Sequence, residues 1–222
     1  MSLKEQLAER KANAVQRMGE DAVAEMNAAT KRLHESGLAD RAVGVGMTAP
    51  LFAMPDATGK TVTLTDLLTA GPVILNFYRG TWCPYCNMEV REFQKLLPEI
   101  EAAGGNLVAI SPQTPDNSLT LVEKNELEFH VLSDIGNAAA REYGLVFTID
   151  NGLRKVFQEV LKLDVPAYNG DGTWELPLPA TYVIGRDGKV VFADVDPDYT
   201  RRAEPSEVLD ALRALGNAAA AE

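Results

Sequence analysis

The chain has 222 residues, 46% of them hydrophobic, so one domain of ordinary size plus an appendage can bury a core without disulfides or a structural metal. Its formal net charge of −11 disfavours a nucleic-acid partner, because phosphate backbones attract basic surfaces. Residues 1–6 lack the apolar segment of a secretory signal, and the most apolar run, residues 73–78, is far shorter than the roughly 20 residues that span a bilayer. We therefore expect a cytoplasmic protein without nucleic-acid or membrane partners.

The first 40 residues have a helical pattern. Residues 3–38 contain no proline and carry apolar side chains at helical spacing, which predicts one or two amphipathic helices, interrupted at Gly19 and stopped at Gly37. With a linker after these helices, we divide the chain into an N-terminal helical extension, 1–44, and a main domain, 45–222. The apolar stripe of the extension needs cover from the main domain or from a second copy, and on that basis we expect a homodimer.

The main domain begins with alternating strand and helix patterns. Residues 61–64 alternate as a strand and precede a short helix capped by Thr65. The apolar run from 72 to 78 is typical of a strand that is buried on both faces. A helix over 84–102 and a second buried strand over 106–111 follow, and this order predicts a right-handed parallel crossover.

The second half of the domain completes an α/β fold. The pattern predicts, in order, a helix over 117–125, a strand over 129–132 and a helix over 137–143. An irregular stretch over 150–177 follows, with a candidate helix over 153–160, and then a hairpin with strands over 181–184 and 189–193 and a closing helix over 207–215. A βαβ unit followed by a ββα unit predicts a thioredoxin-like sandwich with a central mixed sheet.

The only two cysteines lie three residues apart at the predicted junction of strand and helix, in Thr81-Trp82-Cys83-Pro84-Tyr85-Cys86. Pro84 suits the first helical position, which makes Cys83 the N-cap, where unpaired N–H groups and the helix dipole favour a thiolate. Cys86 lies on the same helix face, so the pair can close a short disulfide. This arrangement predicts a redox pair.

Several other residues are candidates for the site. Arg79 either stabilises a thiolate and polarises a peroxide oxygen, or forms a surface salt bridge. Thr81 and Trp82 are supporting residues, and Trp82 either shields the site or simply packs. Pro179 precedes the hairpin, where a proline beside the redox pair is often cis and borders the substrate groove. We expect no metal, since the two histidines, His34 and His130, lack ligand spacing.

Three segments together resemble a known family. They are Asn76–Cys86, Ile110–Thr114 and Pro179–Ile184, and they resemble the peroxiredoxin-like branch of the alkyl hydroperoxide reductase/thiol-specific antioxidant family over about residues 45–214. The resemblance implies a thioredoxin fold and reduction of hydrogen peroxide or organic hydroperoxides by a cysteine. It also implies regeneration by thioredoxin or a similar dithiol, and no cofactor.

The chain departs from the usual pattern of that family. An ungapped comparison places Arg79 where the family has Pro, Cys83 where it has Thr, and Cys86 at the peroxidatic position. The activating Arg of the family would fall near Pro179. The comparison therefore nominates Cys86 as the attacking sulfur, whereas helix capping nominates Cys83, as does its expected greater exposure, and the sequence leaves the order open.

The sequence is compatible with three functions. The leading hypothesis is a thiol-dependent peroxidase that is recycled by a thioredoxin-like reductant. The intact Cys-x-x-Cys and Pro179 also suit a protein-disulfide reductase of thioredoxin type. The third hypothesis is a redox-sensing binding module whose N-terminal helices change partners on oxidation.

Overall fold

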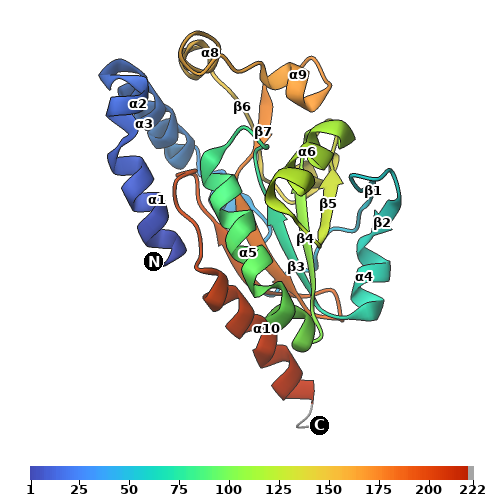
Figure 1. Cartoon of the computed structure of the whole chain (residues 1–222). Coiled ribbons are helices and arrows are strands. Elements are labelled where there is room, and N and C mark those ends of the chain that lie inside the picture. The colour runs from blue at the N-terminus through green and yellow to red at the C-terminus, as the bar shows by residue number, and fades with distance from the viewer. Residues whose placement is uncertain (220–222) are drawn as a thin grey trace.

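The computed structural model describes residues 1–219, with side chains through residue 216, and a five-stranded mixed sheet forms its centre (Figure 1). In spatial order the strands are β5 (His130–Ser133), β4 (Asn106–Ser111), β3 (Val73–Phe77), β8 (Ala180–Ile184) and β9 (Val190–Val195). The first three run parallel to one another, and β8 is antiparallel to both β3 and β9. The α/β prediction with a central mixed sheet is confirmed.

Helices cover both faces of this sheet. On one face α5 (Pro84–Ala102) and α10 (Pro205–Ala219) pack against Ile74 of β3, and α6 (Pro115–Asn125) packs nearby on β5. On the other face α4 (Leu64–Ala70) and α7 (Ala138–Glu142) contribute to a cluster that contains Leu75 and Phe77. Because alternate β3 residues enter opposite clusters, the strand is buried on both faces, as its continuous apolar sequence predicted.

Some local predictions are wrong. The cap of α4 is Thr63, whose Oγ1 accepts a hydrogen bond from Asp66 N at 3.0 Å, and not Thr65. In the stretch over 150–177, the helix expected over 153–160 is present as α8 (Asn151–Lys155) and a π-helical turn over Val156–Val160, whereas α9 (Val165–Asn169) and β7 (Glu175–Pro177) were not expected. Two strand pairs stand outside the central sheet: β1 (Ala53–Pro55) with β2 (Thr61–Thr63), and β6 (Val146–Thr148) with β7.

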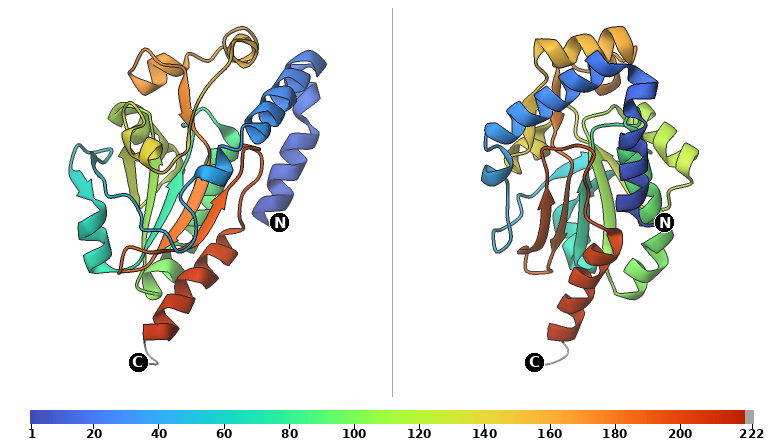
Figure 2. Two further views of the ribbon diagram at one scale, coloured as in Figure 1. Left: turned by 180° about the vertical axis from the view of Figure 1, so that it is seen from behind. Right: turned by 90° about the vertical axis from the view of Figure 1, so that its left-hand side faces the viewer.

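The N-terminal extension consists of α1 (Leu3–Ala12), α2 (Ala14–Met18), α3 (Glu20–Glu35) and a 3₁₀ turn over Ala39–Arg41. It runs along the side of the domain beside α5 and then across its top (Figure 2). Gly19, at φ +83°, separates α2 from α3, as predicted. Leu3 and Leu7 are buried in a cluster with residues of α5, so the main domain covers the apolar stripe.

This packing bears on two further predictions. The homodimer stays a prediction, although the exposed stripe that motivated it is absent from α1. The division of the chain at residue 45 also stays a prediction. The extension shares hydrophobic clusters with the main domain. No helix among the described residues is both long enough and apolar enough to cross a membrane.

Candidate active site

The turn that carries the cysteines leaves β3 through Gly80. This residue has φ +147°, and a Cβ there would lie 2.4 Å from Trp82 Nε1, so the turn requires glycine. Gln113 holds the next residue from the side: its Oε1 accepts from Thr81 N at 2.6 Å and its Nε2 donates to Thr81 Oγ1 at 3.1 Å. Thr81 therefore fixes the shape of the turn.

Cys83 is the N-cap of α5, as predicted. Its Sγ accepts a hydrogen bond from Cys86 N at 3.4 Å, and the two sulfur atoms lie 2.8 Å apart in the reduced pair. Both residues have an exposed fraction of 0%, so the expectation that Cys83 is the more exposed sulfur is wrong. The pair can close a disulfide with little movement of the backbone.

Each sulfur faces a buried guanidinium. Arg79 Nη2 donates to Cys83 Sγ at 3.4 Å, and Arg202 Nη2 donates to Cys86 Sγ at the same distance. Arg79 is only 4% exposed and stacks over the ring of Tyr199 at 4.0 Å and that of Trp82 at 5.2 Å. Of the two roles considered for Arg79, contact with a thiolate fits this geometry and a surface salt bridge does not.

Sequence reasoning missed Arg202 and Glu89. Arg202 lies in the loop after β9, and its Nε donates to Glu89 Oε2 at 2.6 Å in an ion pair whose side chains are 2% and 1% exposed. A charged residue on the inward face of a helix, three positions after Cys86, was a signal that could have identified Glu89. Arg202 offered no comparable signal, since its loop has no periodic pattern.

The environments push the two thiol pKa values apart. Burial opposes the Cys83 thiolate, but the hydrogen bond from Cys86 and the charges of Arg79 and Arg202 hold its pKa well below the ordinary value. Burial and the neighbouring sulfur raise the pKa of Cys86 well above its ordinary value. The reduced site is therefore a Cys83 thiolate that accepts a hydrogen bond from the Cys86 thiol.

We expect these shifts to appear in a titration of the reduced protein by thiolate absorbance near 240 nm. One thiolate persists as the pH falls below about 8.5, the value for a free cysteine, because a lowered pKa keeps Cys83 ionised there. The Arg79→Gln variant, which removes a donor and a charge, titrates at higher pH. Two thiolates that both appear near pH 8.5 in the wild type would contradict the assignment.

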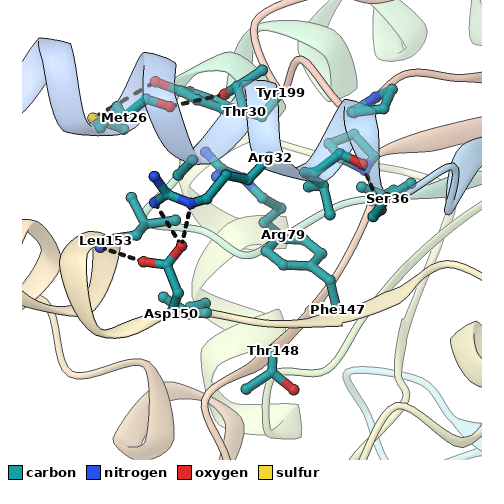
Figure 3. Close-up of a pocket in the computed structure, with 16 residues that line it drawn as sticks. Met26, Thr30, Arg32, Ser36, Arg79, Phe147, Thr148, Asp150, Leu153 and Tyr199 are labelled. Carbon is teal, nitrogen blue, oxygen red and sulfur yellow. Dashed lines mark hydrogen bonds and ion pairs between the residues drawn. The ribbon is translucent and has the colours of Figure 1, made fainter.

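Two cavities meet at Arg79. The first, about 180 Å³, lies between α3 and the segment around β6, where Arg32 and Asp150 pair at 2.6 Å (Figure 3). Pro179 lines this cavity. Because its neighbour Ala180 pairs with Phe77 in the antiparallel register of β8 and β3, Pro179 lies beside Tyr78. The described residues contain no cis peptide bond, so the peptide bond of Pro179, whose isomer the sequence left open, is trans.

The second cavity, about 280 Å³, lies on the other side of Arg79 beside the redox turn. Trp82, Pro84 and Tyr85 line it, and the Trp82 ring meets the ring of Phe157 edge-on at 5.6 Å. Trp82 thus both packs and lines the cavity beside the redox turn. The structure brings Arg79, Trp82 and both cysteines together, with Thr81 behind the turn and Pro179 across Arg79.

A cysteine pair at the N-terminus of a helix, at the carboxyl end of a central strand, defines a thiol-based oxidoreductase of thioredoxin fold. The profile of the AhpC/TSA family matches residues 45–193, and the chain belongs to that family. Its sheet order and helices agree with those of peroxiredoxin structures, so the thioredoxin-like prediction is confirmed.

The similar proteins include both a putative peroxiredoxin and a thiol-disulfide oxidoreductase. The chain is 30% identical over 155 residues, 70% of this chain and 87% of the relative, to a Mycobacterium tuberculosis protein named "Putative peroxiredoxin Rv2521". It is 28% identical over 148 residues, 66% and 67% of the two chains, to the thiol-disulfide oxidoreductase ResA of Bacillus thuringiensis. The crystal structure of peroxidoxin BcpB from M. tuberculosis superposes with a TM-score of 0.60 at 24% identity, covering 77% of this chain and 97% of that one.

Proposed function

We propose that this protein is a thiol-dependent peroxidase in which Cys83 and Cys86 reduce hydrogen peroxide or an organic hydroperoxide. The observation that carries the proposal is the complete burial of both sulfurs, each under a guanidinium. The cavity of about 280 Å³ is lined by Arg79 and by both chain neighbours of Cys83, Trp82 and Pro84, so it offers a small hydroperoxide a route toward the sulfur and is too small for the disulfide of a folded protein. Burial therefore favours a small oxidant over a protein substrate.

The proposed reaction cycle needs only the two cysteines, the hydroperoxide and one external dithiol. The Cys83 thiolate attacks the distal peroxide oxygen, the O–O bond breaks, and the released alkoxide takes up a proton to leave as alcohol or water. Arg79, which donates to the Cys83 sulfur, is placed to stabilise the charge that develops on the peroxide oxygens. The Cys86 thiol then displaces water from the Cys83 sulfenic acid to form the disulfide.

Thioredoxin or a similar dithiol returns two electrons through a mixed disulfide. A reducing compartment such as the cytoplasm suits this cycle, because it keeps both thiols reduced between turnovers. Peroxide and a thioredoxin-like reductant are the partners that we propose on the strength of family membership.

The test is a coupled assay with thioredoxin, its reductase and NADPH. We expect the protein to consume hydroperoxide far faster than an equal concentration of free cysteine, and to reduce insulin disulfides no faster than background. Peroxide consumption no faster than free thiol would overturn the proposal. Fast insulin reduction in the same preparation would support the protein-disulfide reductase, which the similarity to ResA favours as the second candidate.

A further inference from the structure

The cavity beside the redox turn, lined by Trp82 and Pro84 on either side of Cys83, is larger and more apolar than hydrogen peroxide requires. It lies between the N-terminal extension and the redox turn, with Trp82, Tyr85 and Phe157 among its aromatic walls and a volume of about 280 Å³. Hydrogen peroxide would leave most of this space to water in contact with apolar side chains. The walls suit a substrate with an apolar body.

Three arginines line the same cavity, and no aspartate or glutamate does. Arg10 and Arg17 come from the N-terminal extension, and Arg79 comes from the redox turn. Within residues 1–216 none of the three pairs with a carboxylate, in a chain with 32 acidic and 21 basic residues, and Arg79 faces the Cys83 thiolate. Asp198 on the neighbouring loop is bound by Lys11 at 2.7 Å and so does not neutralise them.

The cationic groups are crowded rather than dispersed. Arg17 Nη2 donates to the carbonyl oxygen of Arg10, and the Arg10 guanidinium stacks over the Tyr85 ring at 5.8 Å. Burial, together with the charge of Arg17, lowers the pKa of Arg10. An anion bound between the two arginines would relieve this repulsion.

Three buried donors that border the cavity also lack acceptors. They are Arg79 Nε, Arg10 Nε and Trp82 Nε1, and Arg79 as a whole is only 4% exposed. A buried donor without an acceptor is costly, so the cavity favours a ligand that brings oxygen atoms to both ends.

We propose that this cavity binds an organic hydroperoxide that carries a carboxylate, an inference that rests on the proposed peroxidase function. Arg10 and Arg17 hold the carboxylate, the apolar body lies against Trp82 and Phe157, and Arg79 directs the peroxide group to Cys83. The sulfur chemistry is that of the general cycle, and the product is the alcohol that still carries the carboxylate.

The test compares cumene hydroperoxide with its para-carboxylate derivative, which differ only in the charged group. We expect kcat/KM to favour the carboxylate by about tenfold, the factor that one charge-assisted hydrogen bond can supply. In Arg17→Gln and in Arg10→Gln this ratio falls roughly three- to tenfold, and high salt lowers it in the wild type. The charge-matched control is Lys124→Gln, an exposed position on α6, which keeps the wild-type ratio.

Binding of 4-isopropylbenzoate, measured by calorimetry against its neutral alcohol analogue, supplies a readout without turnover. A ratio near one in a wild-type protein that turns over both hydroperoxides overturns the inference and leaves the peroxidase function intact. Absence of turnover with either hydroperoxide overturns the peroxidase function. In that case, benzoate binding that depends on Arg10 and Arg17 supports the carboxylate site, and no binding overturns it.

Discussion

The Cys83→Ser variant is expected to lose hydroperoxide reduction by about 10³-fold or more in kcat/KM, because the thiolate that attacks the O–O bond is gone. The structure assigns that thiolate to Cys83 through the N–H of Cys86 at 3.4 Å and the Arg79 guanidinium at 3.4 Å. Stopped-flow measurement of peroxide consumption checks the loss.

The partner variant Cys86→Ser separates attack from resolution. It retains the nucleophile, so one equivalent of peroxide oxidises Cys83 to a sulfenic acid, which persists because no second sulfur condenses with it. Trapping with dimedone followed by mass spectrometry locates the modified residue. If the sulfenic acid forms instead on Cys86 of the Cys83→Ser variant, at an undiminished rate, the order of attack is reversed, as the ungapped family comparison suggested.

The second large effect is expected at Glu89, which supports the guanidinium behind Cys86. The Glu89→Ala variant leaves Arg202 buried without its carboxylate, at a cost of about 3–5 kcal/mol in the free energy of unfolding. Glu89 Oε1 also accepts from Thr181 Oγ1 at 3.4 Å, so this hydrogen bond is lost as well. Chemical denaturation of the reduced protein measures the change.

An exposed ion pair serves as a control that shows how much of this cost in the free energy of unfolding comes from burial of the pair. Glu99 of α5 and Arg213 of α10 also pair at 2.7 Å, but their side chains are 53% and 48% exposed. The Glu99→Ala variant is therefore expected to cost no more than about 1 kcal/mol. Equal costs for the two substitutions would show that the Glu89–Arg202 pair contributes no more than a surface pair.

The sequence predicted the core elements of the fold well, for identifiable reasons. The bounds of α5 follow from Pro84 at its first position and from its apolar stripe, and β3 and β4 follow from continuous apolar runs. In the segment from 150 to 177, α9 and β7 were missed because elements of five and three residues are too short to show a periodic pattern.

The sequence predicted only the part of the site that lies within one short segment of the chain. Local chemistry in the Cys-x-x-Cys motif revealed Cys83, Cys86 and the capping geometry, all within one turn of chain. Arg202 lies 116 residues from Cys86 in sequence, and only the path of the loop after β9 brings it there. Pairing across such a distance leaves no trace in a single sequence.

The burial of the cysteine pair beneath the N-terminal extension has a kinetic consequence. Leu3 and Leu7 pack in the same cluster as Cys83 and Cys86, and no surface of either sulfur reaches solvent. A reductant the size of thioredoxin cannot enter the cavity of about 280 Å³ beside Trp82, so it cannot touch either sulfur in this conformation. In the proposed cycle the oxidised enzyme must therefore unfold locally before it is reduced, and the free energy of that opening limits turnover at saturating peroxide.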